Sequence, residues 1–212
     1  MKKNYGSRTP GEDRFLTIPN ILTLLRLALV PVFLFLILRR QALGALIVFT
    51  AAGLTDFLDG ITARLFHLRT TIGTLLDPIA DKALMAAAFL VLTFSCRDCP
   101  SSIPLWLTAS VLGRDLLIVS GAWFIYRSRG YKNFPPSLLG KINTVFQVTT
   151  VFLVLLSNFV QTDAQAPSFL LPRLASFPLL STFFLLTLAS TALSGIQYVI
   201  RGARLFFSFR PR

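Results

Sequence analysis

The sequence predicts an all-α, polytopic membrane protein with six transmembrane helices. Hydrophobic residues make up 54% of the 212 positions and charged residues only 14%, so there is too little charge to cover a soluble protein of this size. Six apolar stretches follow one another without overlap, each near the roughly 20 residues that a helix needs to cross a bilayer. Basic residues are concentrated in alternate connections between these stretches, as is typical of membrane-inserted chains.

The predicted helices are joined by short connections, which makes consecutive helices antiparallel neighbours. Their expected ranges are 21–38, 41–64, 74–95, 103–126, 142–160 and 177–200. Residues 1–212 therefore form one predicted membrane domain, with both termini on the same side. Residues 1–14 are polar and basic and are expected to form a mobile arm, and residues 15–19 could begin a short interfacial helix.

The chain is strongly basic, with a formal net charge of +12 from 21 Lys and Arg against 9 Asp and Glu. Such a balance would ordinarily suggest a nucleic acid partner. If the N-terminus is cytoplasmic, however, the inner side carries fourteen of these basic residues and the outer side four. This distribution indicates membrane topology and attraction to anionic lipid headgroups, and we expect no nucleic acid partner.

The two cysteines, Cys96 and Cys99, form a C-x-x-C pair in the outer loop between the third and fourth predicted spans. Such a pair can oxidise outside the cytoplasm. No second pair exists to complete a zinc site, and we interpret the motif as incidental to function.

Four aspartates lie at the inner ends of the second and third predicted spans. Asp56 and Asp59 are three residues apart in the second span, and Asp77 and Asp81 are four residues apart in the third, so each pair shares one face of its helix. Carboxylates within membrane segments cost a few kcal/mol each, which marks them as candidates for a working site. Because the two spans are antiparallel and joined by a short inner loop, we expect the pairs to face each other.

Four carboxylates at one place require protons or cations. Two of them about 6 Å apart repel by roughly 3 kcal/mol at an effective dielectric constant near 20. An all-oxygen ligand set favours hard ions such as Mg²⁺, Mn²⁺ or Ca²⁺, which commonly assist displacement at phosphorus. Gly60 and Gly73 border the aspartates and could let phosphates approach, although each could equally serve helix packing.

Together these residues form the pattern D-x-x-D-G-x-x-A-R-x8-G-x3-D-x3-D over residues 56–81. Its fixed positions are Asp56, Asp59, Gly60, Ala63, Arg64, Gly73, Asp77 and Asp81. This pattern resembles the signature of the CDP-alcohol phosphatidyltransferases, and the six-span layout is also similar to that family's. Two further segments, within residues 19–26 and 140–147, resemble its glycerol-type branch.

The resemblance implies a homodimeric enzyme of phospholipid biosynthesis that transfers a phosphatidyl group from CDP-diacylglycerol to an alcohol and releases CMP. A two-metal site holding Mg²⁺ or Mn²⁺ would be formed by Asp56, Asp59, Asp77 and Asp81. The donor nucleotide would lie against Gly60, Ala63 and Gly73, with Arg64 as a further substrate-binding candidate that also satisfies the positive-inside pattern. We expect the site and both termini on the cytoplasmic side of a bacterial inner membrane.

Asp81 is the expected general base as well as a metal ligand. With the diphosphate neutralised by metal, the proton of the acceptor hydroxyl remains to be removed, which a carboxylate beside the metal can do. The chain has one histidine, His67, which we interpret as a solvated residue of the inner loop.

Arg114 and Lys141 are the candidates for binding an anionic acceptor. Arg114 could instead form an internal ion pair with Asp115, which follows it within the fourth span. Lys82 is interpreted as a headgroup or topology residue, because it points about 100° away from Asp81 around the helix.

The glycerol-type segments favour glycerol 3-phosphate as acceptor, giving phosphatidylglycerophosphate, with phosphatidylglycerol, giving cardiolipin, as the alternative. A cation or proton transporter is a remote alternative from another class, since it too would carry carboxylates in the membrane. Its carboxylates would be distributed across the membrane, whereas four of those in this chain lie at one boundary.

Overall fold

The computed structural model describes residues 18–65, 71–96, 99–129, 137–162 and 177–208, with some side chains near the ends of helices left undescribed. These ranges contain six helices and no strand, which confirms the all-α prediction. The helices are α1 (Ile18–Leu38), α2 (Ala42–Leu65), α3 (Thr71–Phe94), α4 (Leu105–Arg129), α5 (Leu138–Thr162) and α7 (Phe177–Ser208).

Each predicted span coincides with one helix, and most ends agree within a few residues. The exception is α7, which was expected to end at residue 200 and continues to Ser208. Arg201 and Arg204 end the apolar run but are good helix formers, so the helix continues beyond the apolar stretch. The predicted arm at residues 1–14 and most of the predicted interfacial helix at residues 15–19 lie outside the described residues.

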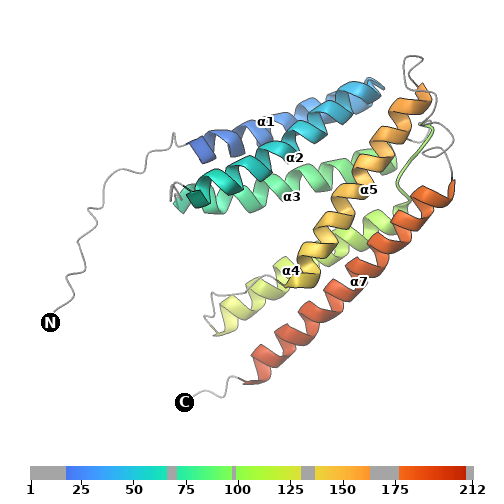
Figure 1. Ribbon diagram of the computed structural model, residues 1–212. Coiled ribbons are helices and arrows are strands. Elements are labelled where there is room, and N and C mark those ends of the chain that lie inside the picture. The colour runs from blue at the N-terminus through green and yellow to red at the C-terminus, as the bar shows by residue number, and fades with distance from the viewer. Residues whose placement is uncertain (1–17, 66–70, 97–98, 130–136, 163–176, 209–212) are drawn as a thin grey trace.

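The helices α1, α2 and α3 form one group, and α5 connects this group to α4 and α7 (Figure 1). α1 packs against both α2 and α3, α5 contacts α2, α3 and α7, and α4 packs mainly against α7. The buried apolar core includes Phe33 of α1, Phe49 of α2, Phe89 of α3 and Leu155 of α5. The three-helix group therefore has a continuous core that also takes in the middle of α5.

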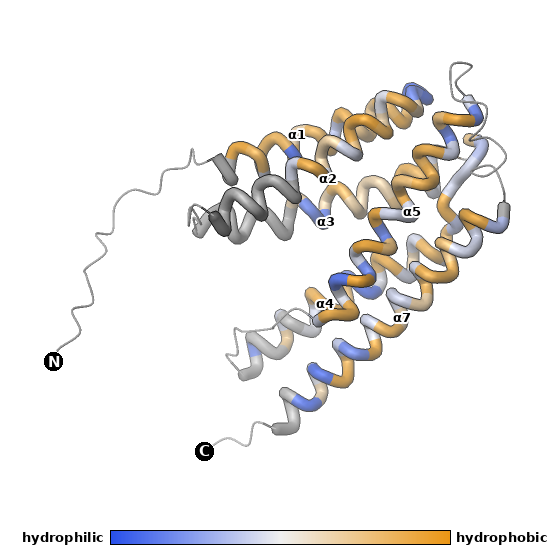
Figure 2. The backbone as a smooth tube through the Cα atoms, viewed as in Figure 1, coloured by the Kyte–Doolittle hydropathy of each residue, from blue (hydrophilic) through white to orange (hydrophobic). Residues whose placement is uncertain are grey.

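Apolar residues make up most of the described helices, as the orange colouring of Figure 2 shows. Three helices contain stretches long and apolar enough to cross a membrane, namely Ile21–Leu38, Leu138–Thr162 and Pro178–Arg204. Exposed leucines and isoleucines also occur on α2 and α4, for example Ile47 and Leu116. Large exposed apolar surfaces are rare on soluble monomers, so the fold supports a membrane protein, while the full set of six spans stays a prediction.

A tight turn joins α1 to α2 at Arg40. The Arg40 amide donates to the Ile37 carbonyl and the Gln41 amide to the Leu36 carbonyl, both at 2.9 Å, which is the hydrogen-bond pattern of a Schellman C-cap. Arg40 has a φ of 60°, in the left-handed region that glycine usually occupies at this position. The turn reverses the chain within three residues and makes α1 and α2 antiparallel neighbours.

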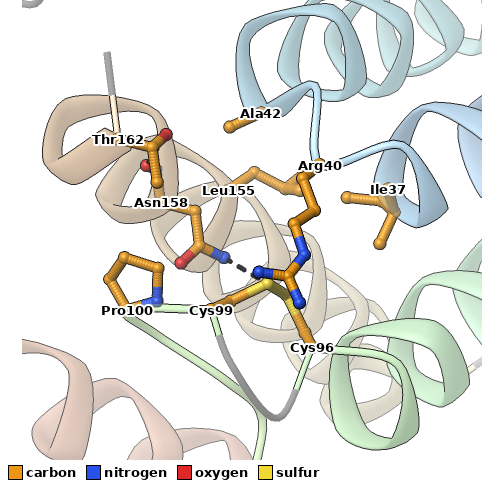
Figure 3. A pocket seen from close by; sticks show the side chains of 9 residues that line it. All are labelled: Ile37, Arg40, Ala42, Cys96, Cys99, Pro100, Leu155, Asn158 and Thr162. Atoms are coloured by element: carbon orange, nitrogen blue, oxygen red, sulfur yellow. Dashed lines mark hydrogen bonds between the residues drawn. A yellow bond between two sulfur atoms is a disulfide. The ribbon is translucent and has the colours of Figure 1, made fainter. Parts of the chain in front are cut away.

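Cys96 and Cys99 are joined by a disulfide at the end of α3, so the pair that we interpreted as incidental has a structural role. The next loop is held to α5 by Asn158, whose side chain accepts from the Ser101 amide at 2.8 Å and donates to the Ser101 carbonyl at 2.9 Å. Figure 3 shows the disulfide, Asn158 and Arg40 around one small pocket of about 80 Å³. At this end of the bundle the loop that follows α3 is therefore held to α5.

Candidate active site

The signature residues lie where α2 ends and α3 begins. Asp56 and Asp59 are in the last turns of α2, Asp77 and Asp81 follow early in α3, and only residues 66–70 separate the two helices. Both pairs are therefore at the same end of the bundle. The side chains of Asp56, Asp59 and Asp77 lie outside the described part of the structure, so their convergence on a metal stays a prediction.

The remaining signature residues divide in the same way. Gly60, Ala63, Arg64 and Gly73 are helical, but their surroundings are outside the described side chains, and His67 lies outside the described residues altogether. Asp81 is described and is half-buried on α3, next to the core residues Ala80 and Leu84. Among the side chains that the structure describes, no group of three or more potential metal ligands occurs, because three of the four predicted ligands are not included.

A charged cluster lies beside the signature and joins α3 to α4. Lys82 Nζ is 2.7 Å from Asp115 Oδ2, and Arg114 Nη1 is 2.7 Å from Asp115 Oδ1. The ion pair between Arg114 and Asp115, one of the two alternatives for Arg114, is therefore present. Lys82, which we interpreted as a headgroup or topology residue, instead shares this carboxylate and links the signature helix to α4.

Arg114 is held by three different partners. Besides Asp115, its Nη2 donates to Ser194 Oγ at 2.6 Å, and its guanidinium lies 5.5 Å from the centre of the Tyr198 ring. Its side chain is 9% exposed. Ser194 and Tyr198 are both on α7, so Arg114 is positioned between two helices before any ligand binds.

Arg114 and Lys141, the two residues predicted to bind the acceptor, line one cavity of about 250 Å³. Its other charged residues are Lys82 and Asp115, and its wall also includes Ser137, Gly140, Thr144 and Tyr198. Among the described side chains that line this cavity, three cations face one carboxylate, which leaves an excess of two positive charges. The cavity therefore favours an anion. One of its lining residues, Lys82, directly follows Asp81 in the sequence.

The first turn of α5 shapes this cavity. Ser137 precedes the helix, and its Oγ accepts from the Gly140 amide at 3.0 Å, as an N-cap does. A Cβ at Gly140 would lie 3.1 Å from Ser137 Oγ and 3.5 Å from Arg114 Nη2. Glycine at this position therefore leaves the Ser137 cap uncrowded at the start of α5, where Lys141 and Arg114 share the cavity.

The sequence did not reveal several of these residues. Ser137, Ser194 and Tyr198 carry no recognisable signal, since serine and tyrosine are common in membrane helices. The pair of Lys82 and Asp115 had a signal that was missed: both are charged residues within predicted spans, and each required an opposite charge.

The fold and site define a membrane-associated, all-helical protein with an aspartate signature beside a cationic cavity. The model of the CDP-alcohol phosphatidyltransferase family matches residues 16–200. The chain belongs to this family of transferases, as its resemblance to the signature had predicted.

The chain is similar to relatives that carry two different enzyme names. A protein of Streptomyces coelicolor named cardiolipin synthase (CMP-forming) is 40% identical over 154 residues, which cover 69% of this chain and 68% of that protein. A rat protein of the same name is 34% identical over 161 residues, covering 68% of this chain but about half, 52%, of its own length. A protein of Aquifex aeolicus named CDP-diacylglycerol--glycerol-3-phosphate 3-phosphatidyltransferase is 34% identical over 131 residues, covering 62% of this chain and 71% of the relative.

Proposed function

We propose that this protein transfers a phosphatidyl group from CDP-diacylglycerol to an anionic alcohol with release of CMP. The observation that carries the proposal is a cavity whose described side chains have two excess positive charges and include Lys82, the residue that follows Asp81 of the aspartate signature. The signature supplies a place for the donor, and the cavity supplies a place for an acceptor that carries a phosphate. Arg114 and Lys141 then act as the acceptor-binding residues.

The predicted metal ligands fit Mg²⁺ or Mn²⁺ by their chemistry. Asp56, Asp59, Asp77 and Asp81 form an all-oxygen set on two helices that end and begin within a few residues of each other, and hard divalent ions prefer such ligands. When bound, these ions neutralise the diphosphate and stabilise CMP as a leaving group.

Asp81 is the proposed general base that accepts the proton of the acceptor hydroxyl. The freed oxygen forms a bond to the phosphorus of the phosphatidyl group, and the bond from that phosphorus to the bridging oxygen breaks. CMP leaves with the bridging oxygen, and the proton remains on the Asp81 carboxyl group until it passes to water. Arg114, fixed by Asp115, Ser194 and Tyr198, holds the acceptor through its phosphate.

We propose phosphatidylglycerol as the acceptor and cardiolipin as the product. The sequence segments favoured glycerol 3-phosphate, but the relatives from Streptomyces and rat are named cardiolipin synthase. Glycerol 3-phosphate remains the second candidate, supported by the name of the Aquifex relative. Both acceptors carry one phosphate, so the charge of the cavity alone does not separate them.

We also propose six membrane spans, a homodimer, and a bacterial inner membrane location with both termini and the active site on the cytoplasmic side. The distribution of basic residues supports this orientation. The disulfide between Cys96 and Cys99 agrees with it, because disulfides persist on the oxidising side of a membrane. In this orientation the disulfide lies on the outer side of the membrane. The end of α2 and the start of α3, which carry the signature, lie on the cytoplasmic side.

The decisive experiment supplies purified protein with CDP-diacylglycerol, Mg²⁺ or Mn²⁺, and either phosphatidylglycerol or glycerol 3-phosphate. CMP release and the identity of the lipid product are measured for each acceptor, with and without chelator. We expect CMP release to require both metal and acceptor, and cardiolipin to be the product. Formation of phosphatidylglycerophosphate alone would establish the second candidate, and no CMP with either acceptor would reject the enzymatic proposal.

A further inference from the structure

A second, larger hollow lies between α4 and α7 and meets the cationic cavity at Arg114. Its volume is about 430 Å³, and its walls are almost entirely apolar. They consist of Ser110, Arg114 and Leu117 from α4 and of Leu188, Thr191, Ala192, Gly195, Ile196, Val199 and Ile200 from α7. Several of these side chains are exposed on the outer surface of the bundle, so the hollow is an open groove.

We propose that this α4–α7 groove binds an acyl chain of the acceptor, and hence that the acceptor is an anionic glycerophospholipid and not a water-soluble phosphate. This inference rests on the function proposed above. Arg114 lines both the polar cavity and the groove. A ligand with a phosphate at Arg114 and Lys141 and a chain along α7 matches this junction of polar and apolar surface, whereas glycerol 3-phosphate has no part that fills the groove.

The groove is long enough to take part of an acyl chain. Its lining along α7 extends from Leu188 to Ile200, which is about 18 Å at the rise of an α-helix. The hydrocarbon core of a bilayer is roughly 30 Å thick, so one leaflet contributes about half of that. Arg114 lies partway along the groove, level with Ser194 and Gly195 of α7. A headgroup held at Arg114 would therefore direct its chain along the stretch toward Leu188, which is about 10 Å long.

Small side chains create the space. Ala192 and Gly195 lie on the groove wall one turn apart, and a Cβ at Gly195 would lie 3.6 Å from Arg114 Cγ, which is ordinary contact distance. Ala192 is exposed on the groove wall, so a larger side chain there can cover the groove, whereas one at Gly195 would also contact Arg114. A bulky substitution at Ala192 can therefore block the groove selectively.

The groove is better placed for the acceptor than for the donor. The donor nucleotide is assigned to the signature on α2 and α3, which belong to the group around α1, whereas α4 and α7 lie on the other side of the bundle (Figure 1). The acyl chains of CDP-diacylglycerol therefore start from a different part of the molecule.

The test compares two substitutions at neighbouring positions of α7. Ala192→Trp fills the groove, and Leu193→Trp is the matched control, because Leu193 is 55% exposed and lies outside the groove wall. Each variant is assayed for CMP release with dioleoyl-phosphatidylglycerol, with its deacylated form glycerophosphoglycerol, and over a range of CDP-diacylglycerol. Oligomeric state is measured by size-exclusion chromatography with light scattering.

We expect Ala192→Trp to raise the KM for dioleoyl-phosphatidylglycerol about tenfold, the loss that corresponds to roughly two methylenes without apolar contact. Its KM for CDP-diacylglycerol and its rate with glycerophosphoglycerol should match those of the wild type, as should every parameter of Leu193→Trp. Equal effects of the two variants would overturn the inference, as would a selective rise in the donor KM. A change of oligomeric state confined to Ala192→Trp would assign the groove to an interface between copies of the chain.

A measurement without turnover separates this inference from the proposed function. Phosphatidylglycerol with a photoreactive diazirine in its acyl chain is irradiated with the wild-type protein, and the labelled peptides are identified by mass spectrometry. Labelling within residues 105–129 and 177–208, reduced by excess unlabelled phosphatidylglycerol, supports the groove even if no CMP is released. Labelling confined to other helices would reject the groove even if the enzyme is active.

Discussion

Arg114 is a buried cation, and the carboxylate that pairs with it among the described side chains is shared. Asp115 accepts from both Arg114 and Lys82, so one negative charge serves two positive ones. A buried charge that is fully compensated has little to offer a ligand, whereas this arrangement retains attraction for a phosphate. The hydrogen bond to Ser194 and the ring of Tyr198 orient the guanidinium without reducing its charge.

Replacing Arg114 by glutamine should weaken acceptor binding selectively. We expect kcat/KM for the acceptor to fall roughly 10- to 100-fold, which corresponds to the loss of about 1.5–3 kcal/mol for a charged hydrogen bond. Asp115 keeps Lys82 as its partner, so the fold should remain. Steady-state kinetics with varied acceptor and varied donor measure the effect, with Arg204→Gln, an exposed position near the end of α7, as control. An equal loss for the donor would contradict an acceptor role.

Replacing Asp81 by asparagine should abolish turnover while leaving much of the binding of CDP-diacylglycerol. Loss of a general base lowers rates by about 10²–10⁴-fold, and an amide of the same shape preserves packing against the α3 core. CMP release measures turnover, and equilibrium binding of labelled CDP-diacylglycerol measures the donor site. Asp163→Asn, a substitution in a predicted loop, is the control. Unchanged turnover in Asp81→Asn would remove Asp81 as the base.

At the scale of helices, apolar runs predicted where the elements lie but not how they rotate against each other. The six helices were predictable because charged, Pro or Gly residues separate each apolar stretch from the next. The contact between Lys82 and Asp115 depends on the relative rotation of α3 and α4. The groove was not predictable either, because residues such as Ile196 and Leu193 are equally apolar and only packing decides which of them lines it.

The end of α7 shows a second limit of patterns. Hydropathy locates the part of a helix that lies in lipid, and it does not locate the end of the helix itself. Ser208 ends α7 beyond two arginines, because intrahelical hydrogen bonds continue where the apolar stretch stops. For the aspartate site, the spacing of the residues alone was enough to identify the signature. The convergence of its side chains remains a prediction from that spacing.

The disulfide between Cys96 and Cys99 should stabilise the outer end of the bundle. Closing a ring of four residues restricts the unfolded chain by about 2 kcal/mol, and the loop that follows is held by Asn158. We expect Cys96→Ser/Cys99→Ser to lower the Tm of the protein in detergent. Wild-type protein treated with dithiothreitol should show the same decrease, and dithiothreitol should not affect the variant. Equal Tm values for all samples would show that the disulfide contributes nothing.

The whole molecule is organised with oxidised cysteines at one end and the charged site toward the other. The proposed topology predicts that Cys99, left unpaired by Cys96→Ser, reacts with a membrane-impermeant maleimide in intact cells. A cysteine introduced in the N-terminal arm by Ser7→Cys in a background without Cys96 and Cys99 should react only after the membrane is permeabilised. Gel-shift labelling measures both. The reverse pattern would invert the proposed orientation and move the active site to the outer leaflet.

Ser137 caps α5 and at the same time forms part of the wall of the cationic cavity. Winding of the first turn of α5 and occupancy of the cavity are therefore thermodynamically linked, because a phosphate held by Lys141 favours the wound state. If this turn opens in the free protein, Gly140 moves away from Arg114 and the cavity becomes wider. Substrate entry and helix fraying would then be one event, visible as slower amide hydrogen exchange in residues 138–141 when the acceptor is bound.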